Sequence, residues 1–165
     1  MIFIPVPQPV DLKRSLSMYK KILVPLDGSK RAEMIRPHVR ELASRYKATV
    51  IFIRVVEPTY SNGIGETFTS ISASAMDAKL EESESYLDRI ASRFRDKGIA
   101  CKTLVAHGPV VEKIIEAASA EDVDLIAMTS HGRGGLTRIF YGSVAAGILN
   151  RVDRPLFIIR SRWAE

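Results

Sequence analysis

Five short runs of apolar residues recur along the chain, and they are continuous rather than alternating with polar positions. The runs occupy residues 21–26, 48–56, 99–106, 123–129 and 155–160 and are rich in Val and Ile. Continuous apolar runs of this length are typical of parallel strands that are covered by helices on both faces. The pattern therefore predicts five buried strands.

Between these runs, apolar residues recur every three to four positions, which is the period of a helix with one buried face. Helices are predicted over 32–46, over 74–97, after Pro109 and after Gly142. Ser29 is placed to cap the first helix, and Gly98 to end the second. Pro37 conflicts with a helix interior, so we expect either a kink there or a later helix start.

The resulting order, βαβαβαβαβ, predicts an α/β fold. Right-handed crossovers then give a single doubly wound domain, with a five-stranded parallel sheet and helices on both faces. We assign this domain to residues 19–162 and treat residues 1–18 as an N-terminal extension, either disordered or packed on a partner. Residues 57–73, rich in Ser, Thr and Gly, are predicted to form a long loop that is functional or flexible.

Composition narrows the class of protein. The chain has 165 residues, of which 46% are hydrophobic and 26% charged, as expected for one globular domain. It lacks the ~18–20 consecutive apolar residues of a membrane-spanning helix. Its single cysteine, Cys101, excludes an internal disulfide bond and fits a reducing compartment. We therefore expect a soluble cytoplasmic protein.

The net charge of +5 is concentrated at the N-terminal end. Residues 1–21 contribute +3 of it, which leaves +2 for the remaining 144 residues. This excess is too small to indicate a nucleic-acid surface, so nucleic-acid binding is disfavoured.

Candidate chemistry follows the first and fourth strands, because open α/β sheets bind ligands outside the carboxyl ends of strands where the strand order reverses. The fourth strand leads into the glycine-rich segment 130–143. Gly132 allows close backbone approach to an anion, Arg133 adds a forked donor, and Gly142-Ser143 begins a helix with free N–H groups. The segment predicts a phosphate cradle. The alternative is a tight turn whose glycines only solve a backbone problem.

Asp27 follows the first strand and has two interpretations. Its carboxylate is placed to accept from a ribose hydroxyl or to help hold a divalent cation beside phosphates. Alternatively, it acts like an N-cap for the first helix. The sequence does not decide between them.

Other common site chemistries find no support. The chain has neither G-x-x-x-x-G-K-[ST] nor a completed G-x-G-x-x-G. The three histidines are scattered and the cysteine is single, so a zinc or iron site is not indicated. No signature of nucleophilic catalysis is present.

Several segments together resemble the universal stress protein family. They are Lys-Ile-Leu-Val-Pro-Leu-Asp-Gly-Ser at 21–29, Gly-Pro-Val-Val-Glu-Lys-Ile at 108–114, Ser-His-Gly-Arg-Gly-Gly-Leu at 130–136 and Tyr-Gly-Ser-Val-Ala at 141–145. The resemblance covers residues 19–160. The ATP-binding branch of this family carries G-x-x-G, nine residues and G-[ST]. Gly132 and Gly142-Ser143 match the larger part, while Thr129 stands where the first glycine belongs.

This resemblance implies a site for ATP with Mg²⁺ (or Mn²⁺). Pro25, Leu26 and Val50 would lie on the adenine side, and Asp27 would contact the nucleotide and, through the phosphates, the metal. The remaining predicted contacts, on the ribose and phosphates, are Met128, Thr129, Gly132, Arg133, Gly142, Ser143 and Val144.

The resemblance further implies a homodimer formed through the fifth strand, at Phe157, Ile158 and Ile159. The leading hypothesis is an ATP-binding stress-response protein. It would act as a nucleotide-sensitive homodimeric switch with at most slow hydrolysis, because no dedicated general base is evident. The alternative is a nucleotide-free interaction module that works through dimer and protein-partner contacts, and Thr129 favours it. An adenylating ligase is disfavoured, since no pyrophosphate loop follows the first strand.

Overall fold

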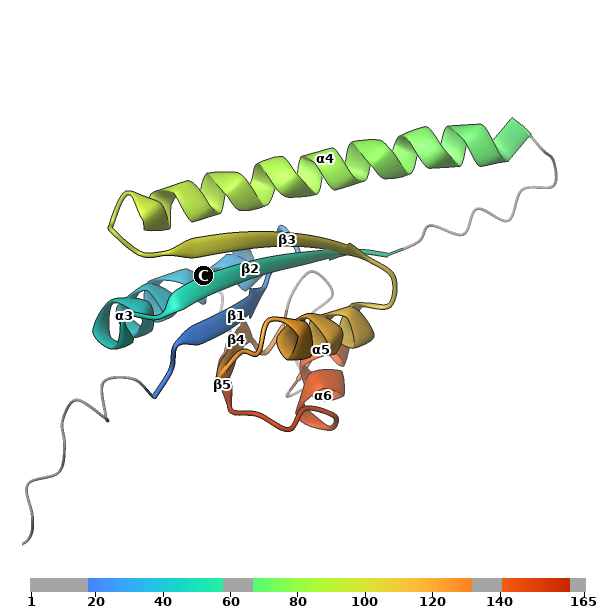
Figure 1. Cartoon of the computed structure of the whole chain (residues 1–165). Coiled ribbons are helices and arrows are strands. Elements are labelled where there is room, and N and C mark those ends of the chain that lie inside the picture. The colour runs from blue at the N-terminus through green and yellow to red at the C-terminus, as the bar shows by residue number, and fades with distance from the viewer. Residues whose placement is uncertain (1–17, 58–66, 132–140, 161–165) are drawn as a thin grey trace, which may run out of the picture.

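A computed structural model describes residues 18–57, 67–131 and 141–160, with the backbone alone for 67–73. The predicted five-stranded parallel sheet is confirmed, and its strand order is β3-β2-β1-β4-β5 (Figure 1). Each strand boundary lies within two residues of the prediction. The strands are β1 (Lys21–Pro25), β2 (Thr49–Val56), β3 (Cys101–His107), β4 (Leu125–Thr129) and β5 (Leu156–Ile159).

Helices cover both faces of the sheet, as predicted. They are α2 (Lys30–Glu33), α3 (Arg36–Tyr46), α4 (Thr67–Arg95), α5 (Val110–Ala120) and α6 (Ser143–Leu149). Helices α3 and α4 pack on one face, and α5 and α6 on the other (Figure 1). Successive strand residues point to opposite faces. In β1, Ile22 and Val24 therefore join the core under α3 and α4, whereas Leu23 joins the core under α5 and α6.

The conflict at Pro37 is resolved by a later helix start. Ser29 caps the short helix α2, with its Oγ accepting from the Ala32 N–H at 3.1 Å. Helix α3 then begins at Arg36, which places Pro37 in its first turn. There the missing N–H would have no intrahelical partner in any case, so proline is tolerated.

The prediction of a loop over residues 57–73 is wrong at its C-terminal end, where the structure has a helix. Helix α4 begins at Thr67, seven residues before the expected start at Ser74. The residues from 67 to 73 are mainly Ser and Thr, which cost only a few tenths of a kcal/mol each in a helix, and no Gly or Pro interrupts them. Residues 58–66 of that loop, and 1–17 of the predicted extension, lie outside the described residues. The end of α4 is as predicted, with Gly98 at a φ of +74° soon after it.

Across the described helices, none is long and apolar enough to cross a membrane. The 29-residue helix α4 is long enough, but charged residues occupy its exposed side.

Cys101, at the start of β3, should react slowly with thiol reagents. Burial raises the pKa of its thiol to about 11, so at pH 8 nearly all of it is the unreactive neutral form. We expect labelling by a disulfide reagent at pH 8 to be at least about tenfold slower in the folded protein than in denaturant. Equal rates in the two states would contradict the buried position of this thiol.

Candidate functional site

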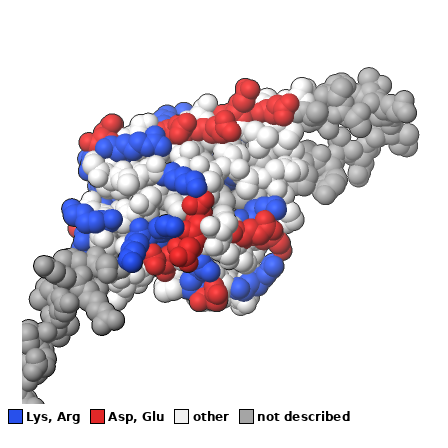
Figure 2. Space-filling model, in the orientation of Figure 1, with Lys and Arg blue, Asp and Glu red and all other residues white. Residues whose placement is uncertain are grey.

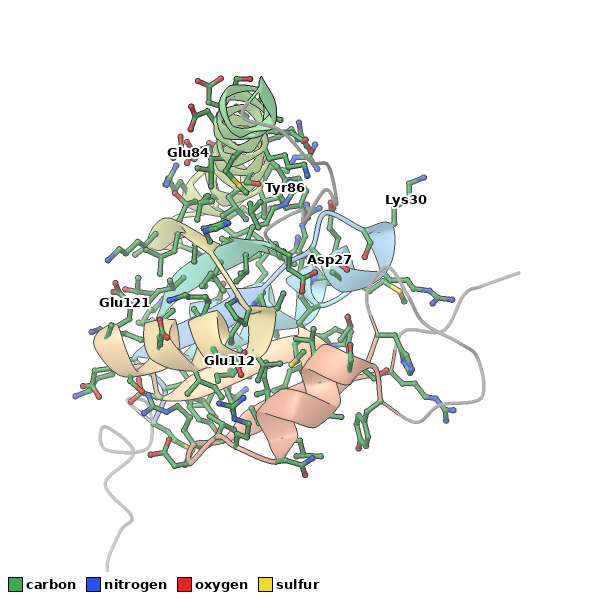
Figure 3. All side chains as sticks on the ribbon, turned by 90° about the vertical axis from the view of Figure 1, so that its right-hand side faces the viewer. Asp27, Lys30, Glu84, Tyr86, Glu112 and Glu121 are labelled. Atoms are coloured by element: carbon green, nitrogen blue, oxygen red, sulfur yellow. The ribbon has the colours of Figure 1, made fainter. Side chains whose placement is uncertain are left out.

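The carboxyl ends of β1, β2 and β4 open onto one cleft, to which α4, α5 and α6 also contribute. Its volume is about 920 Å³, within the usual range of small-molecule sites. It lies where the strand order reverses, because β1 has β2 on one side and β4 on the other. Figure 3 looks onto this edge of the sheet and shows Asp27 between α4 above and α5 and α6 below.

Eight of the eleven predicted site residues line this cleft. They are Pro25, Leu26, Asp27, Met128, Thr129, Gly142, Ser143 and Val144. Two others, Gly132 and Arg133, lie outside the described residues. Residues more than a hundred positions apart in sequence therefore meet at one edge of the sheet.

Val50 does not line the cleft. It stands at the amino end of β2, paired with Ile22 and Cys101, and is fully buried in the core under α3 and α4. The cleft is at the other end of the strand, and a strand rises ~3.3 Å per residue. From β2 the cleft is instead lined by the residues from Ile53 onward, Val55 among them.

Asp27 shapes the turn that follows β1. Its Oδ1 accepts from the Ser29 N–H at 2.8 Å, and Gly28 between them takes a φ of +85°. A positive φ at this position favours glycine, which has no Cβ to clash. The N-cap of α2 is Ser29 and not Asp27. Asp27 supports the helix start only indirectly, through its hydrogen bond with the Ser29 N–H. Because it also lines the cleft, the turn fixes where this carboxylate stands.

The end of β4 is held by short polar contacts. Thr129 is only 5% exposed, and its Oγ1 donates to the His131 carbonyl at 2.8 Å. The Gly142 N–H donates to the Ser130 carbonyl at 2.8 Å. A Cβ at position 142 would lie 3.4 Å from that same oxygen. The residues on either side of segment 132–140 are thus fastened together at the cleft.

Several lining residues were not predicted from sequence. β2 extends three residues past Ile53, the partner of Pro25, and so brings Arg54 and Val55 alongside the cleft. The carboxyl-end rule, applied to β2 as it was to β1 and β4, would have found them. Helix α4 contributes Lys79, Glu82 and Ser83. No sequence signal marks these three, because their place depends on how α4 lies across the sheet.

A partly buried polar network connects the cleft wall to α2. The Arg54 side chain is 12% exposed, donates to Glu82 Oε1 at 3.4 Å and lies 5.1 Å from the centre of the Tyr86 ring. The Tyr86 hydroxyl in turn donates to Glu33 Oε1 at 3.2 Å. Burial, and then the carboxylate of Glu33, raise the pKa of Tyr86 well above its usual range. Tyr86 therefore remains a proton donor across the physiological range of pH.

In the described part of the chain, no group of three or more His, Cys, Asp or Glu side chains is arranged to hold a metal ion.

The Tyr86 hydroxyl should contribute measurably to stability. Tyr86→Phe removes the bond to Glu33 but keeps the ring beneath Arg54. The free energy of unfolding, measured by urea denaturation, should therefore fall by about 1 kcal/mol. Tyr46→Phe is the matched control, since its half-buried ring packs on Tyr19 without any hydroxyl bond to a described residue. Equal effects of the two changes would contradict this role for Tyr86.

Comparison with known proteins agrees with the fold. The model of the universal stress protein family matches residues 18–160. Universal stress protein MJ0577 of Methanocaldococcus jannaschii is 28% identical over 157 residues, covering 88% of this chain and 97% of that protein. Its solved structure superposes with a TM-score of 0.76 and 27% identity, over 89% of this chain and 99% of that one.

Two solved relatives hold nucleotides. A universal stress protein in complex with cAMP has a TM-score of 0.64 and 18% identity, covering 87% of this chain and 98% of its own. A universal stress protein from Archaeoglobus fulgidus in complex with dAMP has a TM-score of 0.58 and 19% identity, covering 86% and 98%. At these identities the likeness shows the fold. The family model, in contrast, spans nearly all of the described residues, and this chain therefore belongs to the universal stress protein family.

Proposed function

We propose that this protein binds an adenine nucleotide, ATP with Mg²⁺ (or Mn²⁺), in the cleft between the carboxyl ends of β1 and β4. The observation that carries the proposal is that eight residues selected from sequence line a single cleft of suitable size. That cleft lies at the reversal of strand order, where open α/β sheets bind their ligands. The relatives in complex with cAMP and dAMP support the class of ligand. The choice of ATP rests on the spacing of Gly132 from Gly142-Ser143.

In this proposal, each wall of the cleft meets a different part of the nucleotide. Pro25 and Leu26 face the adenine, and Val55 takes the place that sequence assigned to Val50. Asp27 accepts from a ribose hydroxyl or supports the metal beside the phosphates. The Ser143 backbone N–H and hydroxyl donate to the phosphate oxygens, while the Gly142 N–H keeps its bond to the Ser130 carbonyl. Asp27 would help to hold a divalent cation beside the phosphates, and this charge would offset the repulsion among the phosphates and with the carboxylates of the cleft.

We further propose that the protein works as a homodimeric switch. β5 is the outermost strand of the described sheet and pairs only with β4, so its other edge is available to a second copy. Phe157, Ile158 and Ile159 are half-buried there. Bound nucleotide would change the surface offered to a partner, with hydrolysis at most slow, because the sequence supplies no dedicated general base.

The second candidate is a nucleotide-free interaction module. Thr129 favours it, since a side chain occupies the position where the ATP-binding pattern has glycine. In the structure, the hydroxyl of this side chain donates a hydrogen bond to the nearby His131 carbonyl.

Calorimetric titration of the full chain tests the proposal. We expect ATP with Mg²⁺ to bind with a dissociation constant well below 1 mM, and GTP more weakly, because the adenine wall is shaped by Pro25 and Leu26. Gly142→Val should abolish binding, because a Cβ there would already contact the Ser130 carbonyl and His131, and the branched side chain would crowd the end of the cleft that we propose for the phosphates. Ser143→Ala should weaken it by about 1 kcal/mol. No detectable binding by the wild-type protein, with its fold intact, would rule the proposal out.

Thr129 provides the sharpest contrast between the two candidates. Because its hydroxyl is turned to the His131 carbonyl, we expect Thr129→Gly to leave ATP affinity unchanged or to lower it by no more than about tenfold, the scale of one lost hydrogen bond. Thr129→Ser keeps the hydroxyl and serves as the control. A clear rise in affinity on Thr129→Gly would show instead that threonine obstructs the nucleotide.

A further inference from the structure

A second concave site lies away from the nucleotide cleft, between the start of α3 and the C-terminal end of α4. Its volume is about 550 Å³. We call it the α3–α4 groove. Four of its lining residues are basic, namely Arg36, Arg40, Arg93 and Lys97, and two are acidic, Glu33 and Asp96.

The basic residues come from two parts of the chain. Arg36 and Arg40 are four apart on α3, so both lie on the same side of that helix. Arg93 is in the last turn of α4 and Lys97 is in the turn that follows the helix, and both are exposed. Figure 2 shows basic and acidic side chains together over the C-terminal part of α4, whereas Asp and Glu predominate along its middle. Positive charge from two separate elements is thus brought to one groove.

The acidic residues of the groove offset only part of this charge, because four basic and two acidic residues leave a net charge of +2. Glu33 pairs with Arg36 and also accepts from the Tyr86 hydroxyl, so it is already engaged. Even Arg36 is not fully satisfied, because its buried Nε has no hydrogen-bond partner. Arg40, Arg93 and Lys97 make no side-chain hydrogen bond or ion pair with any described residue.

Helix stability alone explains only part of this arrangement. Basic residues near a helix C-terminus interact favourably with the helix dipole, which accounts for Arg93 and Lys97. It does not account for Arg40, which lies in the middle of α3 and points its charge into the same groove. Guanidinium groups form two parallel hydrogen bonds with phosphate, and three of the four cations here are arginines.

We propose that the α3–α4 groove is a second binding site, for a small anion that carries two or more phosphate charges. The site is separate from the nucleotide cleft: the two share no lining residue. The arginines would grip the phosphate oxygens from both helices, with Lys97 adding a mobile positive charge. Glu33 would continue to orient Arg36.

Titration of the full chain with inorganic pyrophosphate at low ionic strength tests the site. The test variant is Arg40→Gln with Arg93→Gln. The matched control is Arg45→Gln with Arg95→Gln, which removes the same charge from the same two helices at exposed positions that do not line the groove. Circular dichroism confirms that both variants are folded. We expect the test variant to bind pyrophosphate at least about tenfold more weakly than wild type, and the control to stay within about twofold.

Two results would overturn the proposal. One is that the wild-type protein shows no pyrophosphate binding at concentrations up to 10 mM. The other is an equal change in both variants, which would place the bound pyrophosphate in the nucleotide cleft or on the general surface charge. Loss of ATP binding has no bearing on either result, so this site and the proposed function fail separately.

Discussion

The structure depends on one topological constraint, the reversal of strand order beside β1. The chain leaves β1 towards β2 over the face covered by α3 and α4, and leaves β4 towards β5 through α6 on the opposite face. Because the two connections diverge, no described helix or strand crosses the carboxyl ends of β1 and β4, and a cleft remains between them. The apolar strands therefore build both cores and also bring Asp27, Thr129 and Gly142 to the same cleft.

Several polar groups around this cleft form hydrogen bonds with nearby residues, and these bonds fix the position of the cleft walls. Asp27 fixes the turn after β1, Thr129 bonds to the His131 carbonyl, and the Ser130 carbonyl accepts from Gly142 across the glycine-rich segment. The turn after β1 and the end of β4 are therefore positioned before a ligand binds, which favours affinity. Glu33 belongs both to the network that reaches the cleft through Tyr86 and to the α3–α4 groove. The proposed second site is thus joined to the first through described contacts.

The sequence predicted those features that depend on local pattern. Strand positions could be predicted from apolar runs because both faces of the sheet are buried. The residues that line the cleft from the ends of β1 and β4 could be predicted because open α/β sheets bind ligands at the carboxyl ends of their strands. Val50 was misplaced because it was carried over from the family resemblance, whereas the carboxyl-end rule points to the other end of β2. Lys79, Glu82 and the groove at Arg40 and Arg93 depend on how α4 crosses the sheet, and that angle is set by packing of distant side chains. The helical start at Thr67 was missed because Ser and Thr favour loops only weakly.

A crystal structure grown with ATP and Mg²⁺ tests the central claim most directly. The account predicts electron density for a nucleotide across the carboxyl ends of β1 and β4, with its phosphates at the Ser143 amide and hydroxyl and its ribose near Asp27. Nucleotide bound at another surface, or the Ser143 amide turned away from the phosphates, would contradict it.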